Sequence, residues 1–255
     1  YEEQAGMYWN SGSLAKAVPA YKFVHENRPG DPFAAHMLAY IYTLLQMPEV
    51  AQEWIAAARS RGVNNRWELT VRGYVARLAG DWDALFRVGQ LHLARNGTTW
   101  QGLASLGKQD WEIARASFQR DLSRLNYRQG DEANLDVLMS LVGLALAEKR
   151  LGLNSWSVHS NAAKTYSVDR IKSEETYPTS ILLHQTLAQI AAIEGDIDLV
   201  VKHMQGASDK HFLEHTFLEH DPFFAELREE PRLIAIADQM LERVIAERKK
   251  LEQAE

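Results

Sequence analysis

Apolar residues recur at positions i, i+3, i+4 and i+7 along nearly the whole chain, whereas the strict apolar–polar alternation that marks a strand is almost absent. The first spacing gathers apolar side chains on one face of an α-helix, and it therefore predicts an all-helical protein. The expected helices are mostly about 10 to 18 residues long, and they end at clusters of turn-forming residues. These clusters are NRPGDP, RGVNN, AGDWD, RLGLNS and EGDID.

Small residues recur at an interval of 34 in the first third of the chain, as at Ala5, Ala39 and Gly73. Small side chains let two antiparallel helices pack closely where they cross, and a large residue then fills the groove beside each of them. Glycine tolerates the left-handed conformation that ends a helix. The interval thus predicts tandem helix pairs. It also relates Tyr8, Tyr42 and Ala76; Gly12, Gln46 and Gly80; Ala17 and Ala51; and Val24 and Ala58.

Further helix pairs follow with looser spacing. Residues 107–118 match the turn and second helix of a fourth unit, residues 141–166 match a fifth pair, and residues 186–204 match a sixth. We therefore expect about six pairs over residues 1–230. The alternative, a helical bundle without a true repeat, does not explain why the same positions recur in separate units. The positions in register are Trp111, Ala114 and Phe118 in the fourth unit, Gly152 in the fifth, and Ala188, Ala191 and Gly195 in the sixth.

This 34-residue period, with its small and aromatic positions, resembles the tetratricopeptide repeat (TPR) family across most of the chain. The resemblance implies an all-α, right-handed α-α superhelical solenoid whose concave face binds a protein or peptide. Three stretches are also similar to the TPR tails of bacterial winged-helix transcription regulators of the ToxR/CadC type and of TPR-tailed adenylate cyclases. That similarity implies the sensory or interaction part of a bacterial signalling protein, with the output domain outside these residues. The stretches are GVNNRWELTVRGYVARLAGDWDAL, EGDIDLVVKHM and LEHDPFFAELREEPRL, the last with Glu230 where aspartate is common.

Counting along the repeat places aromatic and polar residues on the concave face, which the first helix of each pair lines. Such residues suit the capture of an extended or helical peptide; in the alternative interpretation, some of the aromatics pack between neighbouring repeats. The carboxylate clamp of some TPR grooves needs lysine and asparagine at set positions, and capture of a free C-terminal carboxylate is not expected here. Those positions hold Glu2, Gly6, His36 and Tyr40. The predicted binding residues are Trp9, Asn10, His36, Tyr40, Thr43, Tyr74 and Arg77.

Residues 231–255 are amphipathic and predict a C-terminal capping helix. One face would be buried on the last repeat and the other would meet water, as the end of a solenoid requires. A coiled-coil homodimer is the alternative, but the apolar stripe is shorter than the about three to four heptads that a coiled coil needs. The stripe consists of Leu233, Ala237, Met240, Val244 and Leu251.

Composition and charge narrow the range of partners. Hydrophobic residues make up 46% of the chain and charged residues 24%, which is typical of a globular protein. The net charge of −6 argues against direct binding of nucleic acid, because neutralising phosphates requires a basic surface. Lys149 and Arg150, on the inner side of the fifth pair, suit either an acidic partner or a solvated helix end whose dipole favours cations.

Missing residue types and motifs exclude several kinds of site. The chain has no cysteine, so disulfides, thiolate metal sites and cysteine nucleophiles are excluded. No P-loop, dinucleotide-binding or G-x-S-x-G motif occurs, and we expect neither a cofactor nor catalysis. No apolar stretch approaches about 18 residues, so no membrane span is expected. The lack of cysteine fits the cytoplasm, where we place the protein, and it fits a periplasm equally well. The start at Tyr1 leads us to expect either a piece of a longer protein or a processed form.

The stretch KHFLEHTFLEH at residues 210–220 carries the remaining candidate chemistry. His211, Glu214 and His215 match H-x-x-E-H, the inverted zinc-protease signature, so a metal-dependent hydrolase is one alternative function. On a helix the two histidines would share a face, but a TPR array does not supply the distant glutamate ligand that the signature requires. We prefer a non-catalytic seal over the open end of the array, and a structural assembly scaffold is a further alternative. The sealing residues would be Phe212, Leu213, Phe217 and Leu218.

Overall fold

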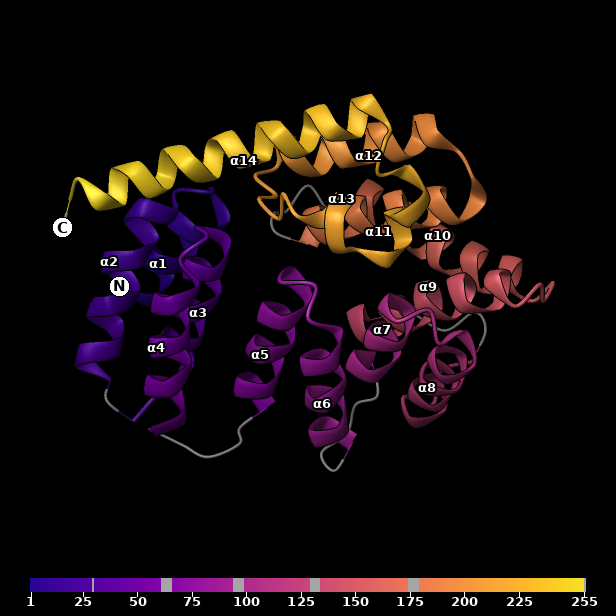
Figure 1. The fold of residues 1–255 in the computed structure, drawn as a ribbon, viewed down its shortest axis with the longest axis horizontal. Helices are drawn as coiled ribbons and strands as arrows, with labels where there is room; N and C mark the ends of the chain where they lie inside the picture. The colour runs from indigo at the N-terminus through magenta and orange to yellow at the C-terminus, as the bar shows by residue number, and fades with distance from the viewer. Residues whose placement is uncertain (29, 61–65, 94–98, 129–133, 174–178, 255) are drawn as a thin grey trace.

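The structure is a computed structural model of residues 1–255, and it describes all of them except 29, 61–65, 94–98, 129–133, 174–178 and 255. The described residues form fourteen α-helices and one 3₁₀ helix, without a β-strand. Successive helices pack against one another along the chain, as in a helical solenoid (Figure 1). The all-α class predicted from the spacing of apolar residues is confirmed.

Twelve of these helices follow one another as six pairs, each joined by a short turn. After the sixth pair come a single-turn helix, the 3₁₀ helix and a long terminal helix. The pairs are α1 (Glu2–Asn10) and α2 (Leu14–Asn27); α3 (Phe33–Leu44) and α4 (Pro48–Ser60); α5 (Arg66–Leu78) and α6 (Trp82–Leu93); α7 (Thr99–Gly107) and α8 (Trp111–Arg124); α9 (Leu135–Arg150) and α10 (Trp156–Ser173); and α11 (Thr179–Glu194) and α12 (Ile197–Asp209). The last three elements are α13 (Phe217–His220), η1 (Pro222–Leu227) and α14 (Pro231–Glu252).

Each pair turns at one residue with a left-handed backbone, with φ between 57° and 84°. The N–H of this residue bonds to a carbonyl three residues back, and the next N–H bonds to a carbonyl five residues back. This pattern of two hydrogen bonds is the Schellman motif, which satisfies the last carbonyls of the first helix. The predicted turn glycines therefore have a backbone role, although two pairs use glutamine instead. The six turn residues are Gly12, Gln46, Gly80, Gln109, Gly152 and Gly195.

The small residues spaced by 34 are buried where helices meet. Ala5 and Ala39 have no exposed surface, and Ala17 and Ala51 are equally enclosed. Gly73 continues the series in α5 but faces the next pair: a Cβ built on it would lie 2.8 Å from the indole ring of Trp100 in α7. The repeat therefore specifies contacts both within a pair and between neighbouring pairs.

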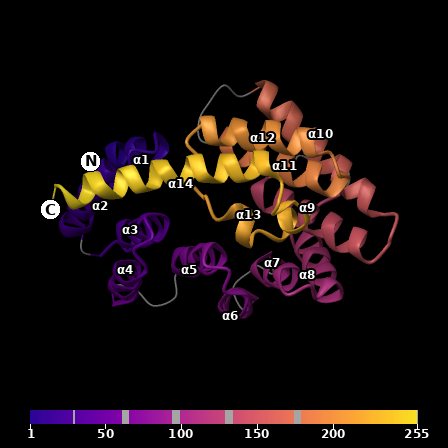
Figure 2. The same cartoon turned by 45° about the horizontal axis from the view of Figure 1, so that its top comes forward.

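Helix α14 joins the two ends of the array. It packs on α12 and on α2, and both views show it reaching from one to the other (Figures 1 and 2). Met240, in its first half, belongs to the core around the later pairs, whereas Val244 and Leu251 belong to the core of the first pairs. The apolar face that a coiled-coil dimer would use is thus covered within the chain. Its buried residues are Leu233, Ile236, Met240, Val244 and Leu251.

The predicted cap on the last repeat therefore describes only part of this helix. A cap would end on α12, but α14 continues to the first pair, where Glu247 accepts a hydrogen bond from the Ala15 backbone N–H. Within the part of the chain that the structure describes, no helix, α14 included, is both long and apolar enough to cross a membrane.

Candidate functional site

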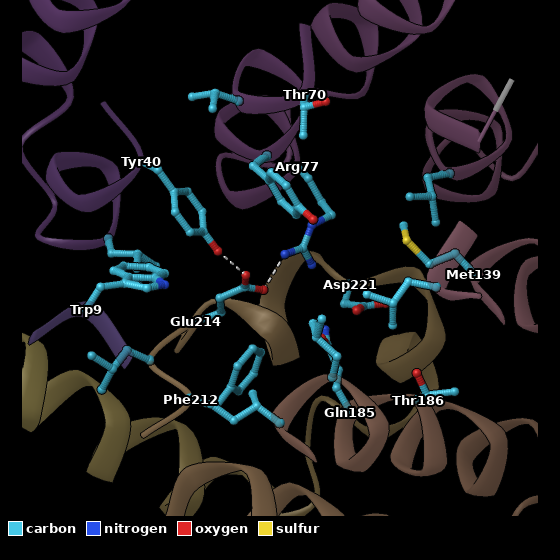
Figure 3. Close-up of a pocket in the computed structure, with 18 of the residues that line it drawn as sticks. Trp9, Tyr40, Thr70, Arg77, Met139, Gln185, Thr186, Phe212, Glu214 and Asp221 are labelled. Atoms are coloured by element: carbon cyan, nitrogen blue, oxygen red, sulfur yellow. Dashed lines mark hydrogen bonds and ion pairs between the residues drawn. The ribbon is translucent and has the colours of Figure 1, made fainter. Parts of the chain in front are cut away.

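A cavity of about 460 Å³ lies inside the curve of the array. One side is lined by residues of α1, α3, α5, α7, α9 and α11, the first helices of the six pairs. The other side is lined by residues 211–214 and 221–223, which follow α12 (Figure 3). The chain thus covers its own concave face with a later segment.

A row of aromatic rings runs across the first four pairs at this cavity. The ring centroids of Trp9 and Tyr40 are 5.1 Å apart, those of Tyr40 and Tyr74 are 5.3 Å apart, and Tyr74 meets Trp100 at 5.2 Å. The first three rings line the cavity. These aromatic residues therefore pack between neighbouring repeats, as the alternative interpretation held, and presentation to a partner stays a prediction. Tilted and edge-on pairs of this kind add stability beyond their buried area.

An ion pair crosses from the array to the covering segment. Arg77 of α5 pairs with Glu214, and the Tyr40 hydroxyl donates a hydrogen bond of 2.6 Å to the other oxygen of the same carboxylate (Figure 3). The guanidinium also lies 5.7 Å from the centre of the Tyr74 ring. Burial alone would lower the pKa of Arg77, but the attraction of Glu214, Tyr40 and Asp221 raises it above its ordinary value. Arg77 therefore remains a cation.

A second buried carboxylate, Asp221, lies near the same guanidinium (Figure 3). It accepts hydrogen bonds from the Phe223 backbone N–H at 3.0 Å and from the Gln189 amide at 3.1 Å. Burial raises the pKa of Asp221, and the charge of Arg77 opposes that rise. The cation of the cavity is thus shared by two carboxylates from the covering segment.

His36 is the polar side chain of the cavity wall whose hydrogen-bonding groups are free. It is 2% exposed, and neither ring nitrogen has a hydrogen-bond partner among the described residues. Burial lowers the pKa of His36, so the neutral ring offers one donor and one acceptor. Buried polar groups are normally paired, so these two enclosed nitrogens are an exception beside the cavity.

Six of the seven residues predicted for the concave face line the cavity. Thr43 does not; its hydroxyl bonds instead to the Ala39 carbonyl on its own helix at 2.8 Å. Counting from later repeats would have found the α9 and α11 walls, where Met139, Gln185 and Thr186 lie (Figure 3). No repeat spacing indicates the covering segment. The six residues are Trp9, Asn10, His36, Tyr40, Tyr74 and Arg77.

Lys149 and Arg150 contact other parts of the chain. The Lys149 ammonium donates to the Ile193 carbonyl at the end of α11, and Arg150 pairs with Glu226 in η1. Both cations therefore join the fifth pair to later elements, and an acidic partner for them stays a prediction.

The segment that holds the H-x-x-E-H match is not a helix. Residues 212–214 have no regular secondary structure, the His215 N–H bonds back to the Leu213 carbonyl at 2.8 Å, and His211 has a left-handed backbone with φ of 67°. His211 and His215 therefore do not share a helix face as expected, and Glu214 is bound by Tyr40 and Arg77. Among the described residues, no group of three His, Cys, Asp or Glu side chains is placed to hold a metal ion.

The apolar residues of this stretch are buried, but not over an open end. Phe212 and Leu213 line the central cavity, and the Phe217 ring meets the Phe224 ring at 5.4 Å. The predicted end-seal is thus wrong in its location: α13 packs on α5, in the third pair.

No protein-family model matches the chain, and no curated protein matches it. The candidate site therefore rests on the cavity, its aromatic row and its ionic centre.

Proposed function

We propose that this chain is a non-catalytic interaction domain with a right-handed, TPR-like superhelix. It takes an extended peptide segment of a protein partner at the central cavity, and it serves as the sensory or interaction part of a larger bacterial signalling or regulatory protein. The observation that carries this proposal is the gathering of predicted concave-face residues around one cavity, with three rings of the aromatic row in its wall.

The size and lining of the cavity suit this function. Ligand sites in proteins commonly measure about 300–1,000 Å³, with mainly apolar walls and a few polar groups that fix orientation. The cavity of about 460 Å³ falls in this range and is bordered by Tyr40, Tyr74 and Trp9. Rigid aromatic side chains lose little conformational entropy on binding and are frequent anchors at interfaces.

The polar groups of the cavity favour binding over catalysis. A nucleophilic mechanism needs a hydroxyl or thiol within hydrogen-bonding reach of a base. His36, the neutral imidazole of this wall, makes no such hydrogen bond among the described residues. The Tyr40 hydroxyl does lie within reach of a carboxylate, that of Glu214, but both oxygens of Glu214 are already engaged, one by Tyr40 and the other by Arg77. Asp221 is likewise held by the Gln189 amide and the Phe223 backbone N–H.

Selection from a random-peptide display library against the purified chain tests the binding function. We expect enriched peptides with an apolar anchor, and at least a tenfold loss of their affinity when Thr186→Phe fills the cavity from α11. Thr43→Phe is the matched control, because Thr43 lies on the same array but outside the cavity wall. Failure to enrich any peptide, or equal affinity for both variants, overturns the proposal.

The signalling role has its own test. Deleting this array from the larger protein should abolish or lock the regulation of the attached output activity. An output that stays equally regulated without the array rules out the sensory role while leaving the binding function to the peptide experiment.

A further inference from the structure

Residues 210–216, hereafter the crossing segment, leave the end of α12 and pass over the concave face of the first three pairs. Phe212, Leu213 and Glu214 are each about 6% exposed and lie in the cavity wall. Thr216 then donates to the Leu78 carbonyl at the end of α5, at 3.3 Å. The contacts join residues separated by more than a hundred positions in the chain, so the segment lies in the array much as a separate peptide would.

The histidines around the crossing segment meet the turns of successive pairs. A Cβ built on Gly12 would lie 3.1 Å from the His211 Cβ, and one built on Gly80 would lie 2.7 Å from the His220 ring. Between them, the Gln46 amide lies 2.9 Å from Nε2 of His215. These three turn residues are spaced by 34, so the chain follows the repeat axis from the first pair to the third.

Binding sites commonly hold a partner through a few apolar anchors and a small number of placed polar or charged groups. Here Phe212 and Leu213 supply the apolar contacts, and Glu214 supplies the charge that meets Arg77. The upstream flank is held independently, because Arg243 of α14 donates to the Ser208 carbonyl of α12 at 2.7 Å. The contact between α12 and α14 therefore does not depend on the crossing segment.

We propose that Phe212–Glu214 is an internal ligand of the site, and that the partner is a peptide with two apolar residues followed by a carboxylate. This proposal rests on the proposed binding function and names the partner's chemistry. When the crossing segment leaves, Arg77 loses the carboxylate that pairs with it directly and keeps only the nearby charge of Asp221, and a buried cation that is incompletely compensated is unfavourable. An incoming peptide that brings its own carboxylate restores the direct pair, which makes acidic, apolar peptides the specific competitors.

Internal occupancy also sets the apparent affinity. A partner binds only those molecules whose site is vacated. Its apparent affinity is therefore its intrinsic affinity multiplied by the vacated fraction. A substitution that weakens the internal ligand should therefore strengthen binding of the same sequence added as a separate peptide. A substitution of a residue that only contacts the partner would weaken that binding.

The test uses fluorescence anisotropy of a labelled, end-capped hexapeptide with the sequence of residues 211–216, HFLEHT. We expect the full chain carrying Glu214→Gln to bind this peptide at least tenfold more tightly than the unmodified chain. A peptide with glutamine in place of its glutamate should lose at least tenfold on the same variant. Leu213→Ser, which weakens the apolar half, serves as a second variant, and circular dichroism checks that each variant is folded.

The outcomes separate the two proposals. Equal affinity of the variants and the unmodified chain, or indifference to the peptide's carboxylate, overturns the internal-ligand proposal. If display peptides bind at the cavity but HFLEHT binds no variant, the internal-ligand proposal fails and the binding function stands. If nothing binds at the cavity, both fail.

Discussion

Glu247, near the end of α14, caps α2 at Ala15, which lies 232 residues earlier in the chain. Its Oε2 accepts a hydrogen bond of 2.9 Å from the Ala15 backbone N–H. Ser13 occupies the N-cap position of α2 but makes no capping bond with its side chain. The acceptor that a helix start requires therefore comes from the terminal helix, and its negative charge suits the helix dipole.

Replacing Glu247 with alanine should lower the free energy of unfolding by about 1 kcal/mol, the usual effect of losing a helix cap. Urea denaturation followed by circular dichroism measures it. Glu242→Ala is the control, since Glu242 is exposed on the same helix, and a change within about 0.5 kcal/mol is expected there. Equal effects of the two substitutions would show that the distant cap is not stabilising.

The ring of Phe118 in α8 lies against a glycine on each neighbouring helix. A Cβ built at Gly102 would lie 2.7 Å from this ring, and one at Gly143 would overlap it. Gly143→Ala should be destabilising overall, because overpacking costs about 1–3 kcal/mol and exceeds a helix-propensity gain of about 1 kcal/mol. In a double-mutant cycle, Phe118→Leu should relieve part of this loss. Strictly additive effects would contradict the close contact.

The turn residues offer a test of backbone conformation alone. Gln109 holds a left-handed φ of 62°, and Gly195 one of 84° with open space around a built Cβ. Gln109→Gly should stabilise the chain by about 1 kcal/mol, and Gly195→Ala should destabilise it by a similar amount. Thermal unfolding of each variant measures its change in stability relative to the unmodified chain. Changes of the same sign would be inconsistent with a left-handed turn residue in each pair.

Two histidines, one on α11 and one on α12, should lower the free energy of unfolding in acid. His184 and His203 face each other with their Nδ1 atoms 3.3 Å apart. Burial, and to a smaller extent the nearby His184, lowers the pKa of His203 to about 4. Because this pKa lies below the unfolded value of about 6.5, the unfolded chain binds more protons. The stabilising contribution is present above about pH 6.5 and is lost as the pH falls toward 4. His203→Gln should flatten the stability profile between these values, and an unchanged profile would exclude this pair as the cause.

Local signals in the sequence predicted the helix pairs well. The 34-residue interval marks Gly12, Gln46 and Gly80, because each ends a helix by the same short-range hydrogen bonds. The fourth turn, at Gln109, comes early because α7 has only 9 residues, so strict counting loses register there while the turn itself remains recognisable.

The covering of the concave face was not predictable in the same way. Glu214 meets residues 174 and 137 positions away, and no periodic pattern links it to Tyr40 or Arg77. The H-x-x-E-H match favoured a helix, but the chain leaves α12 through a left-handed residue at His211 and continues without helical structure to residue 214. Likewise, the apolar stripe of α14 predicts a buried face without specifying that α2 covers half of it.

The central claim is that Phe212–Glu214 occupies the binding site and gives way to a partner. The chain has no cysteine, so Leu213→Cys introduces a single thiol into the crossing segment. Leu213 is 6% exposed, whereas Ile245 on α14 is 39% exposed and provides the control site for Ile245→Cys. We predict slow maleimide labelling at position 213, at least tenfold faster labelling when HFLEHT is present at saturation, and fast labelling at position 245 regardless of peptide. A rate at position 213 that does not change when the peptide is bound would contradict the account.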